Sequence, residues 1–160
     1  MQMQRIFSRF GARARGDLAK RWVRTFSERG VKRCEDSQTW LSLVVKPTGL
    51  PNFSRASAGD ILRWTDLVTG ISAIQHAESA GAATLAFDRV SLSQPITAFD
   101  VVRFSAEVVS VGRTSMLVLC QGFRQDMHTQ ELTPVLKSYV TYVAMGKNGR
   151  PVQVRPSLES

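Results

Sequence analysis

Few residues of this 160-residue chain have the type and spacing to carry out chemistry, and Asp66 is the first to consider. It lies in the stretch 56–81, ASAGDILRWTDLVTGISAIQHAESAG, on a stripe of small residues that recurs at helical spacing: Thr69, Gly70, Ala73 and Ala77. Small side chains let another backbone approach closely, so we expect the carboxylate to lie against protein. Asp66 is therefore a candidate catalytic carboxylate, with an ordinary solvated surface acid as the alternative.

Other reactive side chains are scarce. The chain has two cysteines, Cys34 and Cys120, without a CxxC motif, and two histidines, His76 and His128. The chain has too few cysteines and histidines to supply the ligands of a zinc or iron–sulfur site, so we expect no metal and no bound cofactor. Both histidines are interpreted as ordinary surface or packing residues.

The elements that must position Asp66 begin with a helix over 56–81. Ser57 and Asp60 form a near capping box at its start, and Gly81 is the expected stop. Apolar residues recur three or four apart along it and predict one apolar face: Ile61, Trp64, Val68, Ile71 and Ile74.

Strand-like runs surround this helix. One run precedes it, over 37–46, and four follow it, over 84–92, 100–111, 115–124 and 136–145. One strand, a long helix and four successive strands predict an α+β fold, an antiparallel sheet with the helix on one face. Several strands are apolar on both faces, more than one helix can cover, so we expect a second subunit to close the outer face or the edge of the sheet.

Charge is concentrated at the N-terminus. Residues 1–33 hold ten Lys or Arg and two acids, whereas residues 34–160 hold eleven of each. A basic, amphipathic segment short of acids is typical of a mitochondrial presequence, and Arg24-Thr25-Phe26-Ser27 resembles a matrix-processing site. The alternative is a basic arm that stays on and binds RNA or anionic lipid. No apolar run approaches the roughly 18 residues of a membrane span.

Several local sequences together resemble the hotdog-fold acyl-CoA thioesterases, in the acyl-CoA hydrolase branch, over residues 40–156. Gly59 and Asp66 keep the seven-residue spacing that the family has between the start of its central helix and its Asp. The runs 88–100, 108–116 (VVSVGRTSM) and 142–151 match the family's later strands, and the second is the most specific match.

The resemblance implies a hotdog domain over residues 34–160, assembled as a dimer or a trimer of dimers, that hydrolyses fatty acyl-CoA. The basic N-terminal segment adds the expectation that it does so in the mitochondrial matrix. Asp66 would be general base or nucleophile, working across a dimer interface, and Gly59 would supply an oxyanion donor at the helix N-terminus. Coenzyme A enters as part of the substrate. Its phosphates would be held at the candidate binding residues Gly112, Arg113, Thr114, Ser115 and Arg150.

The chain also departs from the family pattern in its catalytic loop. The family has an Asn fifteen residues before the Asp, where this chain has Pro51, and Asn52 is one position away as the candidate water-positioning residue. Ala58 and Phe99 replace two glycines of the family. An alternative function is therefore a catalytically decayed hotdog domain, kept as a structural subunit of a mitochondrial ribosome or respiratory complex that it joins through the basic arm.

Overall fold

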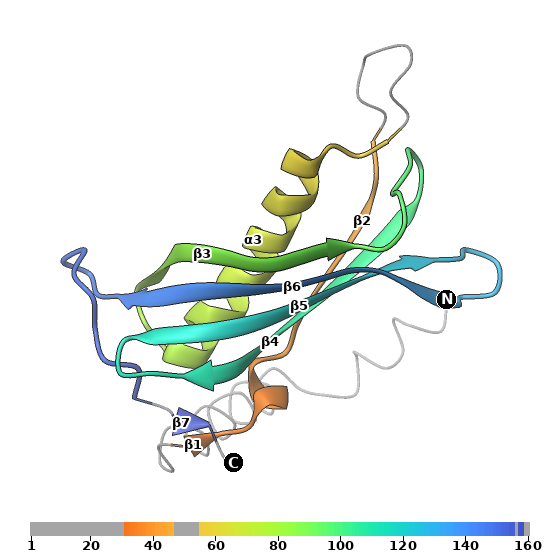
Figure 1. Ribbon diagram of the computed structural model, residues 1–160. Helices are drawn as coiled ribbons and strands as arrows, with labels where there is room; N and C mark the ends of the chain where they lie inside the picture. The colour runs from red at the N-terminus through yellow and green to blue at the C-terminus, as the bar shows by residue number, and fades with distance from the viewer. Residues whose placement is uncertain (1–30, 47–54, 156, 159–160) are drawn as a thin grey trace, which may run out of the picture.

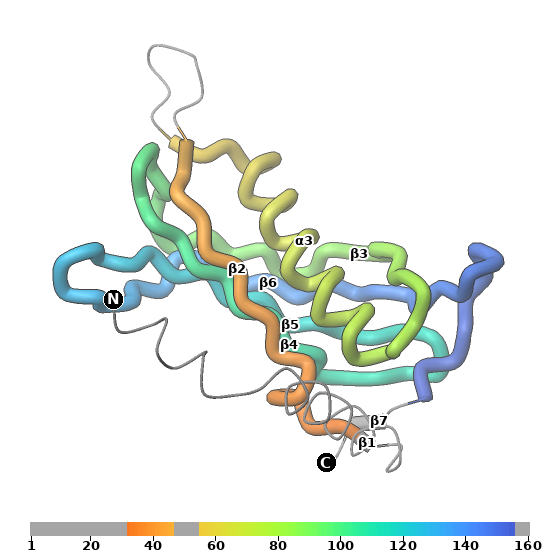
Figure 2. Tube along the Cα trace, turned by 180° about the vertical axis from the view of Figure 1, so that it is seen from behind, coloured from red at the N-terminus to blue at the C-terminus, as the bar shows by residue number. Residues whose placement is uncertain are grey.

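The computed structural model describes residues 31–46, 55–155 and 157–158. Its centre is a five-stranded antiparallel sheet with one long helix, α3 (Ala58–Ala77), lying on one face (Figures 1 and 2). The strand order is β2-β4-β5-β6-β3, and the strands are β2 (Thr39–Val44), β3 (Gly81–Leu92), β4 (Val101–Val111), β5 (Ser115–Gln125) and β6 (Leu132–Met145). The predicted α+β architecture, a sheet wrapped around one helix, is confirmed.

The helix begins as the sequence predicts and ends earlier. The side chain of Ser57 accepts a hydrogen bond from the backbone N–H of Asp60 at 3.1 Å, and the carboxylate of Asp60 accepts one from the backbone N–H of Ser57 at 3.3 Å. At the other end, Glu78 takes the left-handed conformation (φ 51°) that terminates the helix. The predicted stop at Gly81 is wrong, because Gly81 is already the first residue of β3.

The face of α3 that meets the sheet is made mostly of small and polar residues. Its buried residues are Ile61, Thr65, Val68, Thr69, Ser72, Ala73, His76 and Ala77. Ile71 and Ile74, which the periodicity assigned to the apolar face, are exposed, as is Leu67. The exposed apolar residues therefore form a stripe at helical spacing on the side of α3 that the described chain leaves uncovered.

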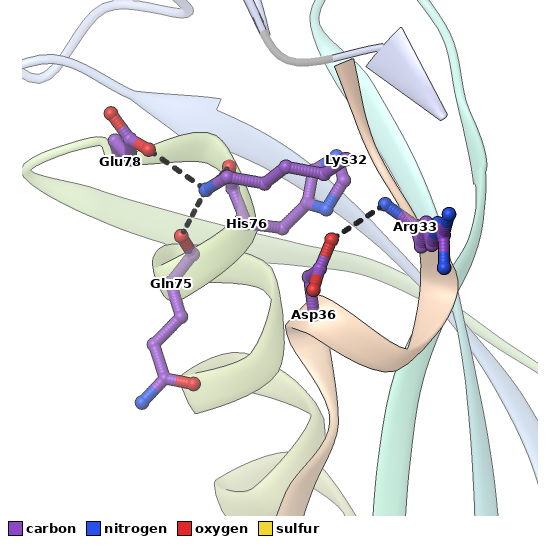
Figure 3. A network of polar contacts seen from close by, with 6 residues as sticks. All are labelled: Lys32, Arg33, Asp36, Gln75, His76 and Glu78. Atoms are coloured by element: carbon purple, nitrogen blue, oxygen red, sulfur yellow. Dashed lines mark hydrogen bonds and ion pairs between the residues drawn. The ribbon is translucent and has the colours of Figure 1, made fainter. Parts of the chain in front are cut away.

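A short segment before β2 is tied to the C-terminal end of α3 (Figure 3). β1 (Val31–Lys32) pairs in parallel with β7 (Ser157–Leu158), and the 3₁₀ helix η1 (Cys34–Ser37) follows β1. The ammonium of Lys32, 7% exposed, donates to the backbone carbonyls of Gln75 and His76 at 3.1 and 3.0 Å. It also pairs with the carboxylate of Glu78 at 2.9 Å. A cation thus satisfies carbonyls at the negative end of the helix dipole.

The core lies between α3 and the inward-facing residues of β4, β5 and β6. These residues alternate along each strand, as a sheet with one buried face requires, and include Phe104, Val118 and Val140. β3 is an edge strand, and most of its residues are exposed, Leu85 and Val90 among them. Within the described part of the chain, no helix is both long and apolar enough to cross a membrane.

Candidate active site

Asp66 lies in the middle of α3 and is half-buried against β3 and β6. Its Oδ1 atom accepts a hydrogen bond from the hydroxyl of Thr84 at 2.6 Å and one from the hydroxyl of Tyr142 at 2.8 Å. Thr84 and Tyr142 stand directly opposite each other in the pairing of β3 with β6. The expectation that Asp66 lies against protein is therefore met, and its partners are two hydroxyl groups from the sheet.

Tyr142 links this carboxylate to the helix backbone. Its side chain is 1% exposed, and its hydroxyl lies 3.0 Å from the carbonyl oxygen of Asp66 and 2.9 Å from the hydroxyl of Thr69. Burial raises the pKa of Tyr142 to about 12, with further contributions from the hydrogen bond and the charge of Asp66. The phenol therefore keeps its proton at neutral pH and acts as a hydrogen-bond donor to the carboxylate.

Gly59 lies in the first turn of α3, at the positive end of the helix dipole. Gly59 is exposed, and no described residue accepts a hydrogen bond from its backbone N–H. A Cβ atom built at Gly59 would come no closer than 3.7 Å, to Ser57, so this chain alone does not require glycine there. Seven residues separate Gly59 from Asp66, roughly 10 Å along the helix axis. The two groups are too far apart to contact one carbonyl group within a single chain.

The remaining catalytic candidate, Asn52, lies outside the described residues, together with Pro51 and Phe53. Phe99 is described and is 74% exposed, with a left-handed backbone (φ 69°) where the family has glycine. Within one chain, the side chain of Phe99 therefore does not cover Asp66. Sterically, a positive φ is costly for a residue with a Cβ atom, which accounts for the glycine preference at this position.

Of the candidate coenzyme A residues, Gly112 to Ser115 form the turn between β4 and β5, near the C-terminal end of α3 (Figure 1), and Arg150 lies in the turn that follows β6. The carbonyls of Arg113 and Thr114 accept backbone hydrogen bonds from Val154 and Ala144, both at 2.9 Å. A Cβ atom at Gly112 would lie 2.8 Å from the hydroxyl of Ser115, which would have to turn away to make room for it. The side chains of Arg113 and Arg150 are exposed at this end of the sheet.

These residues do not converge with Gly59 in one chain. The segment just before α3 meets the β3–β4 connection through the bridge between Arg55 and Thr97, close to the first residues of β4, whereas the turn that carries Arg113 follows the last residues of β4. The structure thus brings together Asp66, Thr84 and Tyr142, and it leaves the helix N-terminus and the arginines at opposite ends of the sheet.

Two surface cavities lie away from Asp66. One, of about 340 Å³, is lined by β2 and the first half of α3, including Leu43, Lys46 and Trp64. The other, of about 420 Å³, lies between Phe99 and the β5–β6 hairpin. In the described residues, no group of three or more His, Cys, Asp and Glu side chains is placed to hold a metal ion. The carboxylate of Asp66 lines neither of these two cavities.

Sequence reasoning missed Thr84 and Tyr142 as partners of Asp66. Both lie in segments predicted as strands, but their meeting depends on the register of β3 against β6, which shifts between Thr84 and Ala86. The available signal was a hydroxyl side chain at a position of β3 and of β6 that faces the helix. Such a hydroxyl does not by itself indicate which helix residue it contacts.

An antiparallel sheet that wraps one helix, with a carboxylate on the sheet side of that helix, defines the protein as a hotdog domain. Residues 55–131 match the family model of the Thioesterase superfamily. An acyl-CoA hydrolase from Bacillus cereus aligns with a TM-score of 0.73 and 30% identity, covering 81% of this chain and 77% of that one. The chain therefore belongs to the hotdog-fold acyl-CoA thioesterases.

Other relatives carry related names. An uncharacterized acyl-CoA thioester hydrolase from Zymomonas mobilis is 29% identical over 120 residues, which are 75% of this chain and 80% of that protein. An acyl-CoA hydrolase from Staphylococcus aureus, solved in complex with butyryl coenzyme A, coenzyme A and coenzyme A disulfide, has a TM-score of 0.75 at 26% identity. That alignment covers 81% of this chain and 77% of the Staphylococcus chain. Alanine variants of an Asn, an Asp and a Thr of the Staphylococcus enzyme have been solved as well.

Proposed function

We propose that the protein is an acyl-CoA thioesterase of the mitochondrial matrix that hydrolyses fatty acyl-CoA to the free fatty acid and coenzyme A. The observation that carries the proposal is the carboxylate of Asp66, held on the helix by two hydroxyl donors to Oδ1. Names of relatives with the same fold support the reaction class. The basic composition of residues 1–33 supports the location.

In the reaction, Asp66 accepts a proton from a water molecule while the water oxygen bonds to the thioester carbonyl carbon. The carbonyl oxygen becomes an oxyanion, and the N–H of Gly59 at a helix N-terminus is the candidate donor to it. The tetrahedral intermediate then expels the thiolate of coenzyme A, which takes the proton from Asp66. Direct attack by the carboxylate, giving an anhydride that water later cleaves, is the second route.

A second copy of the chain is part of this proposal. Because Gly59 and Asp66 of one chain are roughly 10 Å apart, one substrate carbonyl would be bound between groups from two chains. The free edge of β3 and the exposed stripe of Leu67, Ile71 and Ile74 would be covered by the partner, as an apolar face and an open strand edge require. A relative in the same fold is an apo-hexameric acyl-CoA thioesterase, with a TM-score of 0.73 and 28% identity.

The assembly can be checked by light scattering at micromolar concentration. We expect a dimer or a trimer of dimers, with Arg113 and Arg150 placed to bind the phosphates of coenzyme A. A monodisperse species of 17.8 kDa would contradict this part of the proposal.

The test of the reaction is Asp66→Asn. Turnover of acyl-CoA should fall by roughly a hundredfold or more, because the amide is no longer a base. Since the amide oxygen can still accept hydrogen bonds, the free energy of unfolding should change by less than about 1.5 kcal/mol. Glu131→Gln, which neutralises an exposed carboxylate in the β5–β6 hairpin, is the matched control and should keep full turnover.

The second candidate function is a structural subunit of a larger mitochondrial assembly. It is favoured by the departures at Pro51, Ala58 and Phe99, and by the strained backbone of Phe99 where the family has glycine. A well-folded wild-type oligomer that hydrolyses no acyl-CoA of any chain length would refute the enzyme proposal and support the structural role.

A further inference from the structure

The two oxygens of the Asp66 carboxylate have different surroundings. Oδ1 accepts both hydrogen bonds, from Thr84 at 2.6 Å and from Tyr142 at 2.8 Å. No described residue donates a hydrogen bond to Oδ2. A carboxylate can otherwise turn about its last torsion, which is broad and exchanges the two oxygens. Two donors on one oxygen oppose that exchange.

Tyr142 is the better fixed of the two donors. Its side chain is fully buried, whereas Thr84 is an exposed residue of the edge strand β3. A Cβ atom on Gly70, one helical turn after Asp66, would already be 3.5 Å from the Tyr142 hydroxyl, so the phenol packs closely over the helix at this point. The same hydroxyl is 3.0 Å from the main-chain carbonyl oxygen of Asp66. The phenol of Tyr142 therefore contacts both the side chain and the backbone of Asp66.

The protons can be assigned within this network. A phenol carries one proton and two acceptor positions. The hydrogen bond to a charged acceptor is the stronger choice, which directs the Tyr142 proton to Oδ1. The hydroxyl of Thr69, 2.9 Å away, can then donate to the phenol oxygen, or to the carbonyl of Thr65 at 2.7 Å.

We propose that Tyr142 is a positioning residue for the hydrolysis: its hydroxyl holds Oδ1 of Asp66 and leaves Oδ2 as the oxygen that acts on water or on the thioester. This inference rests on the proposed thioesterase function and adds a residue to it. Tyr142 touches neither substrate nor water in this role. It acts through Asp66 by restricting the carboxylate to one orientation in the reacting complex.

The first experiment compares Tyr142→Phe with Tyr139→Phe in steady-state hydrolysis of acyl-CoA. Tyr139 is on the same strand but faces away from α3, with its ring 5.7 Å from the ammonium of Lys137. We expect Tyr142→Phe to lower kcat roughly tenfold with KM changed by less than about twofold, because the lost bond orients a reacting group rather than binding substrate. Tyr139→Phe should leave both constants unchanged, and thermal melting shows that each variant is folded at the assay temperature.

The second experiment does not depend on turnover. The chain has two tyrosines, so in a Tyr139→Phe background the ultraviolet absorbance of tyrosinate reports Tyr142 alone. Adding Asp66→Asn removes the charge and the anionic acceptor that help to raise the pKa of Tyr142 to about 12. We expect the tyrosinate titration to move to lower pH in that double variant, with circular dichroism recorded alongside to follow folding.

The outcomes separate this inference from the proposed function. An active wild type with an unchanged kcat in Tyr142→Phe overturns the positioning role and leaves the thioesterase intact. An inactive wild type overturns the thioesterase, and the titration then decides whether Tyr142 holds Asp66 at all. A tyrosinate titration that is unaffected by Asp66→Asn overturns the contact itself.

Discussion

Lys32 provides a sharp test of how the segment before β2 stabilises α3. In Lys32→Met the apolar stem is kept and the ammonium is lost, together with hydrogen bonds of 3.1 and 3.0 Å to the carbonyls of Gln75 and His76. A hydrogen bond to a charged group contributes about 1.5–3 kcal/mol, and carbonyls at a helix end recover part of this by hydration. We therefore expect the free energy of unfolding to fall by about 2–3 kcal/mol.

Glu78→Gln is the matched control. The carboxylate of Glu78 pairs with Lys32 at 2.9 Å but is 49% exposed, so this ion pair is screened by solvent. Exposed pairs contribute about 0–1 kcal/mol, and we expect a change in that range. The difference between the two variants then measures what the helix carbonyls contribute, as distinct from the ion pair.

The assay is thermal and urea unfolding at one fixed protomer concentration, because assembly would make the transition concentration-dependent. For a chain of this size, each 1 kcal/mol shifts Tm by about 2–4 °C, so Lys32→Met should melt roughly 4–12 °C below wild type. Should Lys32→Met lie within about 0.5 kcal/mol of wild type, Lys32 does not cap α3 in solution and the reasoning fails.

Two further predictions concern alkaline stability and N-terminal processing. Burial raises the pKa of the Cys120 thiol to about 12, so the unfolded chain loses this proton from about pH 9 while the folded chain keeps it. Unfolding free energy should therefore fall with rising pH between these values, by about 1.4 kcal/mol per unit, and Cys120→Ala should have a smaller slope in pH-dependent melts. We also expect protein isolated from mitochondria to begin near Ser27; N-terminal sequencing that finds residues 1–26 intact would instead support a retained arm.

The order and type of the main elements were predictable from the sequence because each has its own local signal. The capping box at Ser57 and Asp60 gave the helix start, and the strand-like runs gave all five strands of the sheet. Local signals failed at the end of the helix. Glu78, which pairs with Lys32 from a distant segment, ends the helix in a conformation that the sequence assigned to Gly81.

The candidate site was predictable only in part. The stripe of small residues indicated that Asp66 faces protein, since small side chains on a helix mark a close approach. The identity of its partners required the β3–β6 register, which places Thr84 opposite Tyr142 and is interrupted one residue later by the bulge at Leu85. Periodicity contains no information about such a register, and a slip of β3 by one residue would turn the hydroxyl of Thr84 away from the helix.

In the proposed enzyme, the position of Asp66 would connect catalysis with assembly. Its two donors come from β6, in the interior of the sheet, and from β3, at the free edge. The donor on β6 is buried by the chain's own core, whereas the donor on β3 is exposed until something covers that edge. The hydrogen bond from Tyr142 to Oδ1 is therefore formed within the buried core, whereas the bond from Thr84 to the same oxygen stays open to solvent until β3 is covered. In the proposed oligomer, a second copy that covers β3 would exclude water from Thr84, and the same copy would bring its helix N-terminus toward Asp66, so that the active site and the interface would form together.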